Sequence, residues 1–178
     1  MSLRISHKWL VAMLILLLAL VGLYLFTAST PPSTNFGEYS CTLTVRCDTI
    51  LENIGQLNPD KMELVPADGL ILAETAVTFA EGESMFAVLK RTLLEQGIHF
   101  EFVETPFFAS AYVEGIANLY EMDCGPLSGW MYRVNGEFAG QGCSLYKLKP
   151  GDKVEWLYTC DLGRDIGGDN ASLGGGGR

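Results

Sequence analysis

The sequence predicts an α+β domain in which one helix packs across a mostly antiparallel sheet. Three observations support this fold class. Residues 39–47 and 154–160 alternate apolar and polar side chains, as half-buried strands do. Residues 84–97 carry one clear helical pattern, and Asn135-Gly136 is a strong signal for a two-residue hairpin turn.

Two strands are expected before the helix. In residues 39–47, the side chains of positions 41, 43, 45 and 47 point to one face and those between them to the other. Residues 48–57 predict a brief helix with Asp48 as its N-cap, followed by a loop around Pro59 and Pro66. Residues 70–79 then predict the second strand.

The helix has recognisable signals at both ends. Ser84 is a favourable N-cap, and Gly97 is the residue type that usually follows a helix C-terminus. Between them, Phe86, Leu89 and Leu93 form an apolar stripe at helical spacing, which predicts the face that packs against the sheet.

Strands are predicted again after the helix. The segments 98–103, 111–116, 129–134 and 154–160 have the composition of strands, and Pro150-Gly151-Asp152 predicts a turn before the last one. The order of two strands, a helix and returning strands is typical of a β-grasp-like arrangement. In such a sheet the first and last strands are neighbours and run parallel.

The N-terminal segment predicts a membrane anchor. Residues 9–26 carry no charged side chain, and a helix needs about 20 apolar residues to cross a bilayer. Arg4 and Lys8 precede this segment, so the positive-inside rule places the N-terminus in the cytoplasm and the later residues outside. A signal peptide cleaved after Ser29 is the alternative, although no Ala-x-Ala pattern precedes that position.

These features divide the chain into a cytoplasmic N-terminus, a membrane-spanning segment, a stalk, a domain and a tail. The stalk is rich in Ser, Thr and Pro, and the tail is rich in Gly and expected to be disordered. The five parts are residues 1–8, 9–27, 28–38, 39–166 and 167–178. The expected location is therefore the cell membrane, crossed once, with the domain outside the cytoplasm.

The net charge of −9 weighs against some partners. Nucleic acids and anionic lipid surfaces attract clusters of Lys and Arg, and no basic stripe offsets the acidic charge. Nucleic-acid binding is therefore not expected.

Five cysteines lie in the part expected to be outside the cytoplasm, where disulfides form. No Cys-x-x-Cys spacing occurs, and His99 is the only histidine after residue 8, so a metal site is not expected. Two disulfides and one free thiol are expected, although sequence alone leaves several pairings open. The β-grasp arrangement favours Cys47 with Cys160 at the ends of the parallel strands. Cys124 and Cys143 flank the hairpin turn as a second pair, which leaves Cys41 as the odd thiol.

Two stretches carry a family resemblance, SGWMYRVNG at 128–136 and GCSLYKLKPGDKVEW at 142–156. Together with ESMFAVLK at 83–90 and YVEGI at 112–116, they resemble the transcobalamin-like C-terminal domain, a small β-grasp-type domain. This domain ends the animal cobalamin carriers and occurs in many exported bacterial proteins. The resemblance covers nearly all of residues 39–166.

The resemblance implies a ligand. In the animal carriers, cobalamin lies between an α-helical barrel and the β-domain, whose aromatic and backbone groups cover the upper face of the corrin. Carried over by position, the candidate ligand-binding residues are Tyr112, Trp130, Gly142 and Tyr146. This sequence contains no helical barrel, so a barrel or transporter protein is expected as a partner, and a corrinoid is the candidate ligand rather than a cofactor.

The alternative interpretation of the aromatic residues is structural. Trp130, Tyr132 and Val134 share one strand face, which is either a platform for a flat ligand or part of the core beneath the helix. No catalytic set is evident, because catalysis by Cys and His needs a reduced Cys beside a His, so no enzyme is expected. Two functions are therefore considered, a binding domain for a corrinoid-like ligand, and an interaction module for a surface protein or wall polymer that uses strand addition.

Overall fold

The structure is a computed structural model that describes Met13 and residues 15–20, 39–105 and 109–168. The chain forms two compact units, Met1–Asn35 and Phe36–Arg178. In the first unit, the described residues are helical and exposed. Among all described residues, no helix is long and apolar enough to cross a membrane.

Several predicted segments fall mainly outside the described part of the chain. These are the N-terminus 1–8, most of the expected membrane helix 9–27, the stalk 28–38 and residues 169–178 of the tail. The first two tail residues are described, and they are not an isolated extension. The amide of Gly168 donates to the carbonyl oxygen of Gly163 at 2.7 Å, which closes the short turn that follows the last strand.

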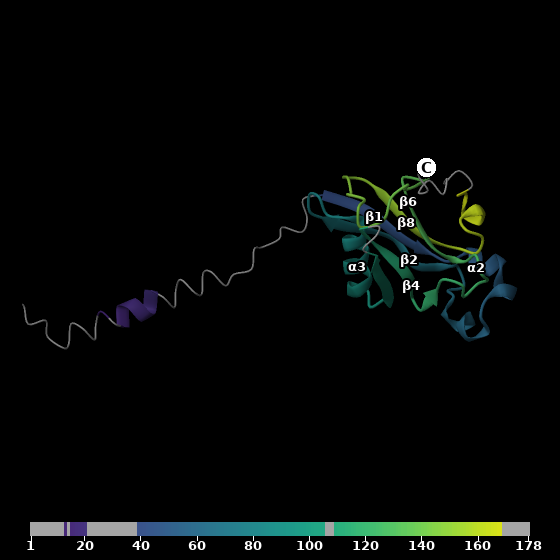
Figure 1. The fold of residues 1–178 in the computed structure, drawn as a ribbon, viewed down its shortest axis with the longest axis horizontal. Coiled ribbons are helices and arrows are strands. Elements are labelled where there is room, and N and C mark those ends of the chain that lie inside the picture. Colours follow the sequence, from purple (N-terminus) through teal and green to yellow (C-terminus); the bar gives the residue numbers. More distant parts are fainter. Residues whose placement is uncertain (1–12, 14, 21–38, 106–108, 169–178) are drawn as a thin grey trace, which may run out of the picture. The chain divides into compact units, whose positions relative to one another are not determined.

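The larger sheet of the second unit has five strands in the order β2-β1-β8-β6-β7 (Figure 1). The first and last strands, β1 and β8, lie side by side and run parallel, as the β-grasp-like arrangement requires. The pairs β1–β2, β6–β8 and β6–β7 are antiparallel. The strands are β1 (Tyr39–Arg46), β2 (Leu70–Phe79), β6 (Gly129–Val134), β7 (Glu137–Phe138) and β8 (Lys153–Thr159).

A second sheet contains three strands in the order β3-β4-β5. Its strands are β3 (Phe100–Thr105), β4 (Ser110–Ile116) and β5 (Leu119–Tyr120). The sequence predicted strands in these segments but did not divide them between two sheets. The physical reason is that this second sheet packs on the core, where Val113, Ile116 and Leu119 belong to the same buried cluster as residues of β1 and β8.

Helix α3 (Met85–Glu95) confirms the predicted helix and both of its end signals. The Ser84 hydroxyl accepts a hydrogen bond from the amide of Ala87 at 3.2 Å. Gly97, with φ +66°, continues the chain in a left-handed conformation just past the C-cap. The helix buries one face, whose residues are Met85, Val88, Leu89, Thr92 and Leu93.

The connection between β1 and β2 is helical but shorter than expected. It contains α2 (Thr49–Glu52) and two 3₁₀ turns, η1 (Ile54–Gln56) and η2 (Pro59–Leu64). Asp48 precedes α2 but makes no side-chain cap bond. Instead, its carboxylate accepts two hydrogen bonds from Arg46, at 3.1 and 2.7 Å, so the ion pair has replaced the predicted cap. A last 3₁₀ turn, η3 (Arg164–Ile166), follows β8.

The core lies between the larger sheet on one side and α3 with the three-stranded sheet on the other. Trp156 on β8 is 3% exposed, and its indole nitrogen lies 3.1 Å from the sulfur of Met85 on α3. Alternating residues of β1 point into the same core. The core side of the sheet was thus predicted correctly for the first and last strands.

The hairpin turn between β6 and β7 is also as predicted. Asn135 and Gly136 have φ values of 54° and 84°, the left-handed pair that a type I′ turn requires. The buried Asp152 fixes this turn, because its carboxylate accepts a hydrogen bond from the Asn135 side chain at 2.9 Å. It also accepts one from the amide of Lys149 at 2.9 Å, which holds the turn before β8.

All five cysteines are buried free thiols, so neither predicted disulfide is formed. Burial raises the pKa of Cys41 to about 11 and that of Cys47 to about 12. Cys143 lies against β4, where its thiol donates to the carbonyl oxygen of Ala111 at 3.2 Å. Cys124 instead neighbours Cys160, a pair that sequence reasoning did not select.

Candidate functional site

The exposed aromatic residue among the four candidates is Tyr112 on β4. Its side chain is 47% exposed, and Val103, which pairs with it across the β3–β4 hairpin, is 36% exposed. Residues that pair directly across two strands share a face of the sheet. Tyr112 and Val103 therefore form an exposed apolar pair on the outer face of the three-stranded sheet.

Gly142 lies beside this pair. Ser110 and Tyr112 are two residues apart on β4 and share a face, and Gly142 packs directly on the Ser110 side chain. A Cβ added at Gly142 would lie 2.3 Å from the Ser110 hydroxyl oxygen, so only glycine fits there. We call Val103, Tyr112 and Gly142, together with the buried Ser110 on which Gly142 packs, the Tyr112 surface.

The loop that contains Gly142 is held by hydrogen bonds to β4 and to the start of α3. On the β4 side, the Ser144 hydroxyl accepts from the amide of Ala111 at 2.9 Å. On the helix side, the first amides of α3 donate to loop carbonyls, Met85 to Tyr146 at 2.9 Å and Phe86 to Cys143 at 3.2 Å. The Tyr112 surface is therefore built on two paired strands and a loop held by hydrogen bonds, which suits a preformed binding site.

Trp130 is part of the core and does not lie on the Tyr112 surface. Its side chain is 9% exposed, and its indole N–H donates to the carbonyl oxygen of Leu119 at 2.8 Å. The ring packs edge-on against Tyr158, with 5.2 Å between ring centroids. The structural interpretation of Trp130 therefore applies, and a ligand has little access to its ring.

Tyr146 faces a different set of neighbours from Tyr112. Its ring meets that of Tyr132 at a centroid distance of 6.3 Å, and its hydroxyl donates to Asp152 at 3.3 Å. Tyr132 in turn stacks on Trp156 with 5.4 Å between centroids. Tyr146 thus closes a half-buried aromatic row, so the structure brings together Tyr112 and Gly142 but not all four candidates.

The electrostatic environment of Tyr112 is acidic. Its hydroxyl donates a hydrogen bond of 2.5 Å to the carboxylate of Glu121. Burial of the hydroxyl, this hydrogen bond and the charges of Glu121 and Glu114 raise the pKa of Tyr112 to about 12. Tyr112 is therefore a neutral hydrogen-bond donor with an exposed ring face at physiological pH.

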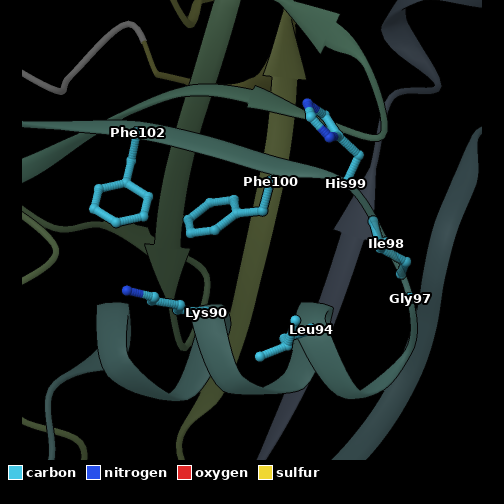
Figure 2. A pocket seen from close by; sticks show the side chains of 7 residues that line it. All are labelled: Lys90, Leu94, Gly97, Ile98, His99, Phe100 and Phe102. Carbon is cyan, nitrogen blue, oxygen red and sulfur yellow. The ribbon is translucent and has the colours of Figure 1, made fainter.

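A pocket between α3 and β3 was not predicted from the sequence (Figure 2). Its volume is about 460 Å³, within the ~300–1,000 Å³ range of small-molecule sites. Phe100 and Phe102 point from β3 toward Lys90 and Leu94 on the helix. The Lys90 ammonium lies 4.8 Å from the centroid of the Phe102 ring, a cation–π distance. The signal available in the sequence was the alternation of residues 98–103 directly after the helix.

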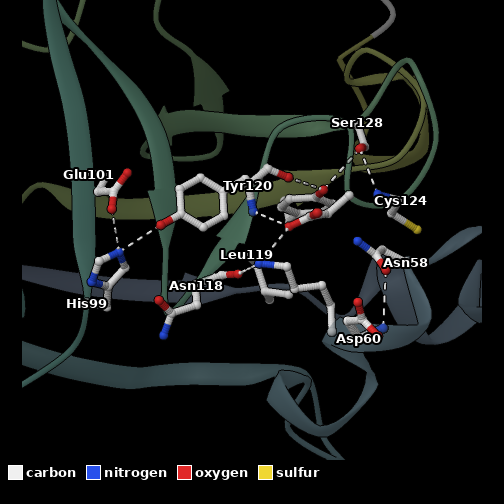
Figure 3. Close-up of polar contacts among 12 residues, drawn as sticks. Asn58, Asp60, His99, Glu101, Asn118, Leu119, Tyr120, Cys124 and Ser128 are labelled. Atoms are coloured by element: carbon white, nitrogen blue, oxygen red, sulfur yellow. Dashed lines mark hydrogen bonds and ion pairs between the residues drawn. The ribbon is translucent and has the colours of Figure 1, made fainter.

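A polar cluster beside the pocket was also missed (Figure 3). One ring nitrogen of His99 lies 2.9 Å from the hydroxyl of Tyr120 and 3.1 Å from the carboxylate of Glu101. Lys61 lies 4.8 Å from the centroid of the Tyr120 ring and pairs with Asp123 at 3.6 Å. This cluster links β3 and β5 to the segment before β2. Its polar side chains are hydrogen-bond or ion-pair partners of one another.

Within the described residues, no group of three or more His, Cys, Asp or Glu side chains is arranged to hold a metal ion. The carboxylates after β8 are bound by protein groups. Asp161 pairs with Arg164, and Asp165 accepts from the amide of Cys160 at 2.7 Å. These residues cap the turn that follows the last strand.

Part of this chain matches a known family model. Residues 82–159, which include all four candidate ligand-binding residues, match a family model described as "Domain of unknown function (DUF4430)". No curated protein sequence matches the chain.

Solved structures provide a likeness of fold. Haptocorrin in complex with Cbi superposes with a TM-score of 0.51 at 18% identity, over 70% of this chain and 25% of the haptocorrin chain. A protein from Ruminococcus gnavus ATCC 29149 has 15% identity over 68% of this chain and 97% of its own, with a TM-score of 0.39, too low to support an inference. The chain therefore shares its fold with a part of haptocorrin and spans about a quarter of that protein's length.

Proposed function

We propose that this domain is a non-enzymatic binding domain for a flat small molecule, with a corrinoid as the candidate ligand. The observation that carries the proposal is the exposed ring of Tyr112 beside the pinned glycine loop. The fold shared with haptocorrin, a structure solved in complex with Cbi, supports the choice of ligand class.

Each part of the Tyr112 surface has a role in this proposal. The ring of Tyr112 and the side chain of Val103 supply an apolar face on which a flat ligand stacks. Gly142 lets its loop pack directly on Ser110, because a Cβ atom there would collide with the Ser110 side chain, and this places the loop beside Tyr112. Glu121 holds the Tyr112 hydroxyl at 2.5 Å, which fixes the ring before any ligand arrives.

Binding by this chain alone should be weak. Tight small-molecule sites bury about 70–90% of the ligand, whereas one sheet face covers a single side of a corrin. A helical-barrel or transporter protein that closes over the other side would complete the site. If residues 9–27 anchor the chain, tethering to the same membrane would raise the effective concentration of the two halves.

The membrane anchor is a separate part of the proposal. It is supported by the uncharged run of residues 9–26 after Arg4 and Lys8. Cell fractionation followed by N-terminal sequencing tests it. The anchor predicts an intact N-terminus in the membrane fraction, and a released form that begins near Thr30 would show a cleaved signal peptide instead.

The binding experiment is equilibrium dialysis of the purified protein against cobalamin and cobinamide. Tyr112→Ala should weaken binding about 5- to 150-fold, since stacking of one flat ring on an aromatic side chain is worth about 1–3 kcal/mol. Tyr112→Phe keeps the ring and is the matched control, and Leu94→Ala tests the α3–β3 pocket as the alternative location. Equal binding by Tyr112→Ala and the parent protein would refute the Tyr112 surface as the site.

One observation favours a second function, an interaction module without a small ligand. β3 is the terminal strand of its sheet, so one edge of its backbone is not paired within that sheet. The apolar pocket lies between this strand and α3. A partner strand added to β3 would satisfy the open edge and extend the sheet. The domain is tested for binding of tetrapyrroles at millimolar concentration, both alone and mixed with the membrane proteins encoded beside it. If no binding is found in either case, the interaction module becomes the favoured function.

A further inference from the structure

Two buried cysteines that are far apart in the sequence meet at α2. Cys124 lies in the loop between β5 and β6, and Cys160 directly follows β8. Their exposed fractions are 0% and 7%. Both belong to the hydrophobic core cluster, and neither is explained by the proposed ligand site.

Helix α2 provides a contact for each thiol. The Cys124 thiol lies 3.6 Å from the carbonyl oxygen of Asn53, and the Cys160 thiol lies 3.9 Å from the hydroxyl of Thr49. Asn53 itself donates from its side chain to the carbonyl oxygen of Thr49 at 2.9 Å. The two sulfur atoms therefore approach the same helical turn.

Hydrogen bonds also join the loop that contains Cys124 to the end of β8, where Cys160 lies. Ser128 is the link, because its hydroxyl accepts from the amide of Cys124 at 3.1 Å. The same hydroxyl accepts from the hydroxyl of Tyr158, two residues before Cys160, at 3.0 Å. The Thr49 hydroxyl then donates to the carbonyl oxygen of Tyr158 at 2.6 Å. These bonds hold the loop at Cys124 against the end of β8.

Besides the burial that raises the pKa of both, the two thiols also shift each other's pKa, since Cys160 lowers that of Cys124 and Cys124 raises that of Cys160. The remaining cysteines have other neighbours. Cys143 contacts Ala111 on β4, Cys47 lies near Asp48 and Asp68, and Cys41 lies near Asp152. The shared contact with one helical turn therefore selects Cys124 and Cys160 as the pair.

We propose that Cys124 and Cys160 form a disulfide when the domain encounters a disulfide-bearing oxidant. The two thiols lose two protons and two electrons as the S–S bond forms, and one disulfide of the oxidant is reduced to two thiols. In this step the side chains would rotate away from Asn53 and Thr49 toward each other, while the hydrogen bonds through Ser128 and Thr49 hold the two segments together. The bond would fasten the loop before β6 to the end of the last strand.

The buried position also sets when the bond forms. Burial raises the pKa of both thiols, and the neighbouring Cys124 raises that of Cys160 further. The thiolate is the nucleophile in disulfide exchange, so oxidation of the folded domain is slow at neutral pH. The bond therefore forms during folding, or when the loop at Cys124 opens.

Peptide mapping of the full chain tests the pairing directly. Each cysteine lies on its own tryptic peptide, with Cys124 in residues 92–133 and Cys160 in residues 154–164. The protein is alkylated at once when cells are broken, or after refolding in a glutathione redox buffer, and is then digested without reductant. The expected result is a cross-link between these two peptides, with the other three cysteines alkylated.

A stability measurement provides a second, independent readout. Dithiothreitol should lower the Tm of the oxidised protein by about 5–15 °C, and the Tm of Cys124→Ser should not respond to it. Cys143→Ser is the matched control, a buried cysteine outside the pair that should keep the response. Five alkylated cysteines after refolding in the redox buffer, or a cross-link from residues 47–61 to 154–164, would overturn the proposal.

Discussion

Replacement of Trp130 distinguishes a core residue from a ligand platform. Trp130→Ala removes an indole that is 9% exposed, its edge-on contact with Tyr158 and its hydrogen bond to Leu119. A buried Trp→Ala change costs about 3–5 kcal/mol, of which an aromatic pair accounts for about 0.5–1.5 kcal/mol. That is a large part of the ~5–15 kcal/mol that stabilises a typical domain.

The assay is urea unfolding followed by circular dichroism. With an m-value of ~2 kcal/mol/M, the Trp130→Ala midpoint should fall by about 2 M. Trp130→Phe keeps an aromatic ring but leaves the carbonyl oxygen of Leu119 without its donor, so a loss of about 1–3 kcal/mol is expected. Tyr112→Ala should change the midpoint by less than about 0.5 M, because Tyr112 lies on the surface.

The reasoning would be refuted by one combination of results. If Trp130→Ala unfolded at the parent midpoint but lost corrinoid binding, the indole would be a ligand platform and its burial against Tyr158 would be incidental. Loss of binding together with loss of stability would instead be the ordinary consequence of a damaged core.

Two further predictions concern single contacts. Ser84→Ala should destabilise the domain by about 1 kcal/mol because the first turn of α3 loses its cap to Ala87, and Ser84→Asp should restore most of that loss in the same urea assay. The hydrogen bond from Arg133 lowers the pKa of Glu155, so its stabilisation is present above the unfolded-state pKa and is lost as pH falls through the lower folded-state value. Glu155→Gln should therefore cost about 1 kcal/mol at pH 7 and almost nothing at the acid end of a pH series of unfolding curves, and an equal loss at both ends would contradict the ion pair.

Local sequence signals were sufficient to predict those helices, strands and turns whose structure depends on residues close together in the chain. The bounds of β2 and β6 were predicted without error, and the helix was predicted to within a residue or two. The Ser84 cap and the Asn135-Gly136 turn are satisfied by atoms a few residues away, so the sequence contains most of the required information.

The face of a strand that turns inward was harder to predict. Alternation placed Trp130 and Tyr132 on one face, but it does not say what covers that face. Trp130 is buried because Leu119 accepts its N–H and Tyr158 meets its ring, and these partners lie on β5 and β8. Contacts between distant strands thus decided which candidate residues stayed exposed.

The neighbours of the cysteines were also decided by contacts between segments that are distant in the sequence. Cys124 was assigned to Cys143 because both flank a hairpin, but the loop before β6 turns toward α2 instead. The Cys124 thiol contacts Asn53, a residue 71 positions earlier in the chain. The spacing of the cysteines does not indicate that this loop packs against α2. The proximity of Cys124 to Cys160 could therefore not be predicted from the sequence.

The two proposed functions meet on the β3–β4 hairpin. Phe102 and Val113 form one cross-strand pair and Val103 and Tyr112 form the next, so the two pairs face opposite sides of the sheet. The pocket lined by Phe102 therefore opens toward α3, whereas the Tyr112 surface lies on the outer face. A partner strand added to β3 would lie next to Val103 and place its own side chains beside Tyr112. Strand addition at β3 would thus bring a second protein to the edge of the Tyr112 surface, where the proposed function needs a partner to cover the other side of the ligand.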